Sequence, residues 1–251
     1  MSTHHPGESL PPWNPPPLPG PVLLAQTWRD VVFVHWPISP ASVSGLFPDG
    51  TWPDTLNGKT YVGIVGFGIP STRVGGVLEI GSASELNVRL YSRDDQGRQG
   101  VVFVSMDATR LDMVLVARAL PRVPYLWSQL QPVRPSPVVA GFRLRRRIPS
   151  RLAADIEIDI EAPVDQASDL EVFLTARWGL HTRTVLGTTW IPIAHQPFPL
   201  YRAKVRSADH ALLTAVGIPA PSQTPQGVLW SPGLDAQVGR PARVSRGSRT
   251  A

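Results

Sequence analysis

Residues 85–107 read Glu-Leu-Asn-Val-Arg-Leu-Tyr-Ser-Arg-Asp-Asp-Gln-Gly-Arg-Gln-Gly-Val-Val-Phe-Val-Ser-Met-Asp. Two strand-like runs flank a link, residues 92–100, that is rich in Asp, Gln and Gly, which are typical of turns. We therefore predict a β-hairpin at the centre of the chain. Side chains alternate along a strand, so Leu86, Val88 and Leu90 share one face. The opposite face is polar and carries Glu85, Asn87, Arg89 and Tyr91.

A strand with a wholly polar face either exposes that face to solvent or lines a wet cavity. Glu85 and Arg89 lie four residues apart, about 13 Å along a strand that rises about 3.3 Å per residue. They cannot pair with each other as they would on a helix, so each needs a partner on another strand or in a ligand. This spacing weakens the interpretation as a solvent-exposed face and leaves the cavity open as the alternative.

The composition limits the class of protein. The chain has 251 residues, 42% of them hydrophobic, which is enough for one large domain or two small ones. It contains no cysteine, which excludes disulfides, cysteine nucleophiles and cysteine-based zinc sites. No apolar run reaches the roughly 18 residues of a membrane span, and the N-terminus lacks the order of a signal peptide. We expect a soluble cytoplasmic protein with no membrane partner.

The formal net charge of +5 comes almost entirely from arginine, since Lys59 and Lys204 are the only lysines. Nucleic-acid binding would need arginines gathered on one face among aromatic residues. The one compact cluster is Arg143–Arg147, and Leu152–Glu161 after it alternates acidic and apolar residues. We predict a hairpin in which opposite charges face each other, a stabilising arrangement, and therefore expect no nucleic-acid partner. A turn centred on Arg151 would pair Arg143 with Asp159, Arg145 with Glu157 and Arg147 with Asp155.

Arg146 points the other way in this hairpin, into the interior with Phe142 and Leu144. A buried arginine needs an anionic partner, because an unpaired buried charge costs several kcal/mol. Glu85 is the candidate for that partner.

The remaining chain divides into a proline-rich arm (1–25), a main domain (26–234) and a basic disordered tail (235–251). Further strands are expected at Gln26–Trp36, Lys59–Ile69, Val185–Ala194, Leu200–Arg206 and Gly227–Trp230. Short helices are expected at Pro40–Phe47, Thr109–Leu120 and Ala208–Val216. Leu170–Trp178 fits either a helix or a strand, Ser71–Gly81 reads as a loop, and prolines make 121–138 irregular.

The count is nine or ten strands against two or three short helices. Hairpin-length connections favour antiparallel pairing, and a twisted sheet of this size curls or closes. We therefore predict a mainly β (α+β) domain: a single antiparallel β-barrel with short peripheral helices at its rim.

Known chemical motifs are missing. There is no His-Glu-x-x-His helix, no Gly-x-Ser-x-Gly elbow and no phosphate-binding loop, so we expect no metal and no cofactor. Polar residues on inward faces are the site candidates: Glu85, His35 and Tyr91 for catalysis, and Arg89, Arg146 and Asn87 for ligand binding.

Several segments together resemble the YqjF-like family of uncharacterised proteins, over roughly residues 27–217. They are Phe33–Pro37, Tyr61–Val65, Glu85–Tyr91, Gly100–Asp107, Phe173–Leu180 and His195–Leu200. That family is grouped with the acetoacetate decarboxylase-like fold, so the resemblance implies a cone-shaped antiparallel β-barrel with an internal cavity.

The decarboxylase activity does not follow from the resemblance. Acetoacetate decarboxylase forms a Schiff base through a lysine in a Pro-Lys-Lys segment, and the nearest match here is Pro121-Arg122-Val123. Arginine stays protonated and cannot form the imine, so Arg122 joins the ligand-binding candidates. Glu85 looks similar to an active-site glutamate of that enzyme.

Two functions follow as expectations. The first is a barrel that binds a small, anionic organic molecule without Schiff-base chemistry. The alternative is a lyase or isomerase that acts on a keto or enol substrate, with Glu85 as acid–base. The sequence leaves a homo-oligomer open.

Overall fold

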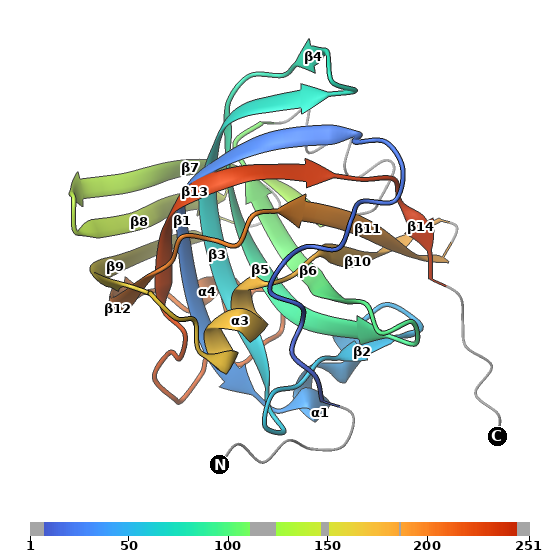
Figure 1. Ribbon diagram of the computed structural model, residues 1–251. Helices are drawn as coiled ribbons and strands as arrows, with labels where there is room; N and C mark the ends of the chain where they lie inside the picture. Colours follow the sequence, from blue (N-terminus) through green and yellow to red (C-terminus); the bar gives the residue numbers. More distant parts are fainter. Residues whose placement is uncertain (1–7, 111–123, 147–150, 186, 245–251) are drawn as a thin grey trace.

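A computed structural model describes residues 8–110, 124–146, 151–185 and 187–244 (Figure 1). Nearly all regular structure in these ranges belongs to one sheet. Its strands are β1 (Leu24–Ile38), β2 (Thr51–Pro53), β3 (Thr60–Val74), β4 (Leu78–Glu79), β5 (Ala83–Asp94), β6 (Gln99–Ala108), β7 (Tyr125–Ser136), β8 (Val139–Arg146), β9 (Ala153–Pro163), β10 (Gly179–Thr184), β11 (Gly187–His195), β12 (Tyr201–Ala208), β13 (Leu229–Val238) and β14 (Ala242–Arg243). The helices are short: α1 (Pro40–Val43), the 3-10 turn η1 (Ser44–Leu46), α3 (Asp169–Thr175) and α4 (Ala211–Thr214).

The sheet closes on itself twice, and the two rings share a wall. A larger ring runs through β1, β3, β5, β6, β7, β8, β9, β12 and β13. A smaller ring leaves the same wall at β6 and returns to β13 through β10 and β11. In Figure 1, β7, β8, β9 and β12 lie to the left of the shared strands and β10, β11 and β14 to the right. Most pairings are antiparallel; β6 pairs in parallel with β7 and β10. The mainly β class with few short helices is confirmed.

The two faces of β5 belong to different rings. Leu86, Val88 and Leu90 pack with Phe142 and Ile156 into the apolar core of the larger ring. Burial of each such side chain contributes about 1.5–3 kcal/mol. The opposite face of β5 lies towards the smaller ring, where Tyr91 packs with α3. The polar face predicted from the sequence is therefore inside the molecule, which excludes the solvent-exposed alternative.

The hairpin β8–β9 forms, but its predicted register is wrong by four residues. Arg143 faces Asp155 with 3.5 Å between Nε and Oδ1, instead of facing Asp159. Asp159 of β9 instead pairs with Arg206 of β12, with 2.6 Å between Oδ1 and Nη2. The charged face of β9 is therefore matched by two neighbouring strands, a solution that no two-strand pattern could indicate.

Strand β7 occupies a segment that we expected to be irregular because of its prolines. It pairs with β6 only at residues 125–127, so from residue 128 onward one of its edges has no strand partner within the described ranges. Pro132 and Pro135 lie in this part of β7. Proline lacks the N–H that a strand partner would need, and no described partner lies along this edge, so proline is tolerated here.

Other segments also differ from their expected type or length. The expected loop Ser71–Gly81 is the end of β3 and its hairpin with β4, and β10 was not expected at all. β13 continues past the expected start of the tail at residue 235. Leu170–Trp178 is resolved in favour of a helix, α3, whose Ser168 and Glu171 form a capping box. The helix predicted at Thr109–Leu120 lies almost wholly outside the described residues. In the described ranges no helix is long and apolar enough to cross a membrane.

Candidate functional site

The smaller ring contains a row of three residues aligned across neighbouring strands: His35 of β1, Gly63 of β3 and Arg89 of β5. Residues in register on adjacent strands point to the same side of the sheet. Gly63 makes this row compact, because a Cβ at this position would lie 2.4 Å from Cδ2 of His35. The absent side chain therefore leaves the space in which the imidazole lies.

His35 is fixed in one tautomer. Its Nδ1 lies 2.9 Å from the carbonyl oxygen of Gly227, which can only accept, so Nδ1 carries the proton. Its Nε2 then accepts from the Tyr91 hydroxyl at 2.7 Å, and that hydroxyl also lies 3.1 Å from the carbonyl oxygen of Leu174. Burial lowers the pKa of His35 to about 3 and raises that of Tyr91 to about 12. Both groups are therefore neutral at physiological pH.

Arg89 is the cation of the site. Its Nε donates to Oδ1 of Asn87 at 2.9 Å, and in the described part of the chain no carboxylate lies within ion-pair distance of it. Desolvation lowers the pKa of the guanidinium, yet part of the side chain remains accessible to water. Asn87 is 1% exposed, and its Nδ2 has no hydrogen-bond partner. Two donors on one face of β5, the Arg89 guanidinium and Nδ2 of Asn87, therefore have no protein anion beside them among the described residues.

His195 of β11 approaches the same row from the opposite wall of the smaller ring. Burial lowers its pKa to about 4; the hydrogen bond with the carbonyl oxygen of Gln196 opposes this shift, and the charge of Arg89 contributes to it. Its ring packs 4.8 Å from that of Trp178 and 5.6 Å from that of Trp28, measured between centroids. The sequence reasoning did not select His195; the only signal was its place in the segment 195–200 that resembles the YqjF-like family.

Glu85 lies on the same face of β5 as Asn87 and Arg89 and is 4% exposed. Its Oε1 accepts from the hydroxyl of Tyr125 at 2.9 Å. Desolvation raises the pKa of the carboxyl to about 7, although the hydrogen bond from Tyr125 opposes the shift. Burial and the neighbouring Glu85 raise the pKa of Tyr125 well above its usual value. Tyr125 was missed because it lies in β7, which the sequence did not indicate as a strand.

Arg146 has a different partner from the one expected. Its Nε and Nη2 donate to the two carboxylate oxygens of Asp107, at 2.9 and 2.6 Å. Ser128 donates to the same carboxylate. Glu85 is therefore not the partner of Arg146. Asp107 faces Leu86 in the β5–β6 register, on the side of the larger ring, so this buried ion pair lies on the other side of the sheet from Arg89. Arg122 lies outside the described residues.

A second buried ion pair closes one end of the polar face. Arg177 follows α3, and its Nη1 lies 2.6 Å from Oδ2 of Asp54. The guanidinium carbon is 4.1 Å from the ring centroid of Phe173 and 4.8 Å from that of Tyr91. Phe173 and Arg177 thus pack against the ring of Tyr91, whose hydroxyl contacts His35.

With the geometry in place, the chain can be compared with known proteins. The family model described as an uncharacterized conserved protein, DUF2071, matches residues 25–235. The chain belongs to the DUF2071 family. A curated relative is the uncharacterized protein YqjF of Bacillus subtilis, 28% identical over 207 residues, which are 81% of this chain and 85% of that protein.

Solved structures share the fold of this DUF2071 protein at low identity. Acetoacetate decarboxylase from Legionella pneumophila matches with a TM-score of 0.62 and 12% identity, over 91% of this chain and 88% of its own. The enduracididine biosynthesis enzyme MppR complexed with pyruvate matches with a TM-score of 0.63 and 13% identity, over 91% and 92% of the two chains. The expected acetoacetate decarboxylase-like fold is therefore confirmed, and at this identity the likeness extends to the fold alone.

The two lysines of this DUF2071 protein lie on its surface. Lys59 is exposed beside the turn that precedes β3. Lys204 is 76% exposed and pairs with Glu161. Neither lies near the polar face of β5.

Proposed function

We propose that this DUF2071 protein binds a small anionic organic molecule in the smaller ring, with Arg89 as the group that holds the anion. The observation that carries this proposal is the partly buried guanidinium with no carboxylate within ion-pair distance among the described residues. Partial desolvation of an unpaired charge is unfavourable, and a bound anion offsets this cost.

Neighbouring groups support an anion over a cation. His35 and His195 are neutral, and their imidazoles face Arg89 without adding charge. Asn87 orients Arg89 through its Oδ1, which leaves its Nδ2 as a free donor beside the guanidinium. Arg146 is held by both oxygens of Asp107, so the proposal rests on Arg89 and Asn87.

Ligand binding by Arg89 can be tested with a panel of small oxo and hydroxy carboxylates, by thermal shift and then by calorimetry. We expect at least one member to stabilise the protein, and Arg89→Ala to abolish that stabilisation. Arg143→Ala, which removes an exposed arginine of β8, is the matched control and should have no effect. Stabilisation that persists in Arg89→Ala would refute the proposal.

The proposal excludes Schiff-base chemistry, because the lysines are on the surface and arginine cannot form an imine. Borohydride treatment in the presence of carbonyl compounds should give no covalent adduct, as read by intact-protein mass spectrometry. An adduct that maps to Lys59 or Lys204 would overturn this exclusion.

One observation favours a second candidate function, an enzyme that moves a proton on a keto or enol substrate. Glu85 has a pKa of about 7, where a carboxyl group can both accept and donate a proton at neutral pH. His35 and Tyr91 hydrogen bond to each other, so their part is to shape the site. Glu85→Gln should then abolish turnover while carboxylate binding persists. Glu157→Gln on β9 serves as the control, and equal turnover in both variants would end this idea.

A further inference from the structure

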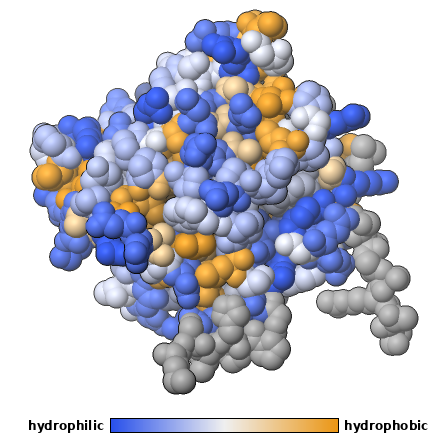
Figure 2. Space-filling view, viewed as in Figure 1, coloured by the Kyte–Doolittle hydropathy of each residue, from blue (hydrophilic) through white to orange (hydrophobic). Residues whose placement is uncertain are grey.

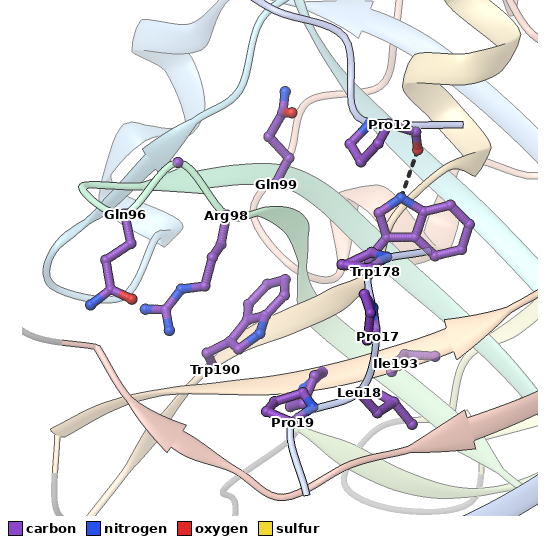
Figure 3. Close-up of a pocket in the computed structure, with 13 residues that line it drawn as sticks. Pro12, Pro17, Leu18, Pro19, Gln96, Arg98, Gln99, Trp178, Trp190 and Ile193 are labelled. Carbon is purple, nitrogen blue, oxygen red and sulfur yellow. Dashed lines mark hydrogen bonds between the residues drawn. The ribbon is translucent and has the colours of Figure 1, made fainter. Parts of the chain in front are cut away.

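A groove beside β10 and β11 is lined by none of the polar residues of β5. Trp178 precedes β10, and Trp190 lies in β11 with Pro192 and Ile193. Together with residues 96–99 they form the walls of a pocket of about 280 Å³. The remaining wall is the chain's own N-terminal arm, through Pro12 and residues 16–19 (Figure 3).

The groove offers hydrogen-bond donors where the arm offers acceptors. Prolines have no N–H, so a proline-rich segment presents mainly carbonyl oxygens. Nε1 of Trp178 donates to the carbonyl oxygen of Pro12 at 2.7 Å, the dashed line in Figure 3. Nε2 of Gln99 donates to the carbonyl oxygen of Ser9 at 2.6 Å. Both donors of the groove therefore bind backbone carbonyl oxygens of the arm.

The start of the arm is held by a separate contact. The carboxylate of Glu8 accepts the backbone N–H groups of Asn57 and Gly58, each at 2.9 Å. Both residues have positive φ, 53° and 73°, in the turn that leads into β3. Two adjacent amides of a turn form a small anion-binding concavity. The arm is therefore anchored at Glu8, Ser9 and Pro12 before it crosses the tryptophans.

Aromatic grooves with an indole N–H are a recurrent way to bind polyproline II segments. We propose that the Trp178–Trp190 groove is a polyproline-recognition site, that residues 8–19 are its intramolecular ligand, and that a proline-rich segment of another polypeptide can replace them. The pocket that remains between arm and groove shows that the arm does not fill it. Trp178 and Trp190 are 4% and 7% exposed beneath the arm.

The arm competes with an external proline-rich segment for the groove, and this competition lowers the apparent affinity of the external segment. A tethered ligand acts at an effective concentration of the order of mM, which masks the groove in the intact chain. Glu8→Ala removes the anchor without changing the groove. Because the anchor consists of hydrogen bonds to a charged group, its loss should tighten the binding of an external segment by about tenfold.

The experiment uses the full chain and a fluorescent synthetic peptide with the sequence of residues 8–19, followed by fluorescence anisotropy. We expect the peptide to bind Glu8→Ala about tenfold more tightly than the wild type. Adding Trp178→Phe to Glu8→Ala should remove this gain, because the ring remains but the N–H donor is lost. Trp52→Phe in the same background is the matched control, since Trp52 is 36% exposed and lies outside both the groove and the arm.

Tryptophan-labelled protein gives a second readout through the indole N–H resonance of Trp178, assigned by its loss in Trp178→Phe. The resonance should move in Glu8→Ala and return towards its original position when peptide is added. Concentration-dependent dimers that disappear with Trp178→Phe would also support the groove and would identify a second copy as the donor of the segment. Peptide affinity that is equal in wild type, Glu8→Ala and the double variant would overturn the proposal. So would equal binding of a peptide whose prolines are all alanine.

Discussion

At the scale of single residues, Glu85 governs how the site responds to pH. It accepts a hydrogen bond from Tyr125, and its pKa is raised from 4.5 to about 7. Between these two values the folded protein retains a proton that the unfolded chain releases. Stability due to this group therefore falls as pH rises from about 4.5 to about 7, by about 1.4 kcal/mol per pKa unit.

Replacing this carboxyl should therefore change the pH dependence of stability. Relative to wild type, Glu85→Gln should gain up to about 3 kcal/mol as the pH rises from about 5 to about 8, because the amide has no proton to lose. Urea unfolding of both proteins at several pH values measures the difference. Glu157→Gln on the charged face of β9 should show no such trend, and a pH-independent difference for Glu85→Gln would contradict the prediction.

The alternation of residues along β5 was sufficient to place Glu85, Asn87 and Arg89 on one face, as the strand register confirms. Their partners could not be found in the same way. Arg146 pairs with Asp107 because of the combined registers of β6, β7 and β8, which one sequence does not specify. Local pattern thus indicates which side chains share a face but not what lies opposite them.

At the scale of elements, glycines in β3 make room for side chains of other strands. A Cβ on Gly63 would meet His35, and one on Gly66 would lie 2.6 Å from Cδ2 of Phe142. The sequence alone does not show this packing role, because it depends on which strands lie beside β3.

Gly63→Ala tests this role. The new methyl should displace His35 from Gly227 and Tyr91 and reduce the free energy of unfolding by about 1–3 kcal/mol, since buried hydrogen bonds are lost. Chemical denaturation measures the loss. Gly45→Ala is the control, because a Cβ there meets no atom within 4 Å. Equal stability of both variants would refute the packing role of Gly63.

The capping box of α3 provides a second prediction at this scale. Ser168→Ala removes the side chain that accepts from the N–H of Glu171 and should destabilise the protein by about 1 kcal/mol. Ser39→Ala is the matched control, because Ser39 precedes α1 without a capping hydrogen bond. Thermal unfolding of both variants distinguishes the two serines; an equal shift in Tm would contradict the assigned role.

Strands were predictable where polar and apolar residues alternated. They were missed where prolines or glycines interrupted the pattern and contacts with other strands decided the structure. β9 alternates without interruption, whereas β7 contains prolines that its unpaired edge tolerates. Gly179 is the first residue of β10, where a Cβ would lie 2.5 Å from the ring of Trp190. Such packing against a neighbouring strand leaves no periodic pattern in the sequence.

At the scale of the whole molecule, buried groups with opposite pKa shifts set the pH of greatest stability. His35 and His195 have pKa values of about 3 and about 4, so the unfolded chain binds protons first and stability falls as pH drops below about 6.5. Asp94 and Glu171, whose pKa values are lowered, act in the same direction at more acidic pH. Glu85 acts in the opposite direction up to about pH 7.

The two histidines outweigh the one carboxyl group, so the free energy of unfolding should pass through a maximum between about pH 6 and about pH 7. Denaturant titrations across the range from about pH 4 to about pH 9 locate it. A stability that continues to rise above about pH 8 would contradict the assignment of neutral histidines and a protonated Glu85.

The surface gives little indication of the interior chemistry. Figure 2 shows a face on which hydrophilic and hydrophobic residues are mixed. Among the described residues the most exposed large hydrophobic side chains include Val77 and Leu78, at the tip of the β3–β4 hairpin. The strand count predicted the mainly β fold correctly, but the presence of two rings depends on the pairings β6–β10 and β11–β13 between strands distant in sequence.

Both rings close through the same contact, in which β1 pairs with β13 over residues 24–33 and 229–238. During synthesis on the ribosome, the first strand of the sheet is made some two hundred residues before its partner. Until those last residues emerge, the nascent chain has an open edge along β1, which is a template for wrong pairing with other chains. Chaperones that shield extended hydrophobic strands should therefore engage this protein late in translation, and premature termination before β13 should yield aggregates instead of a smaller folded form.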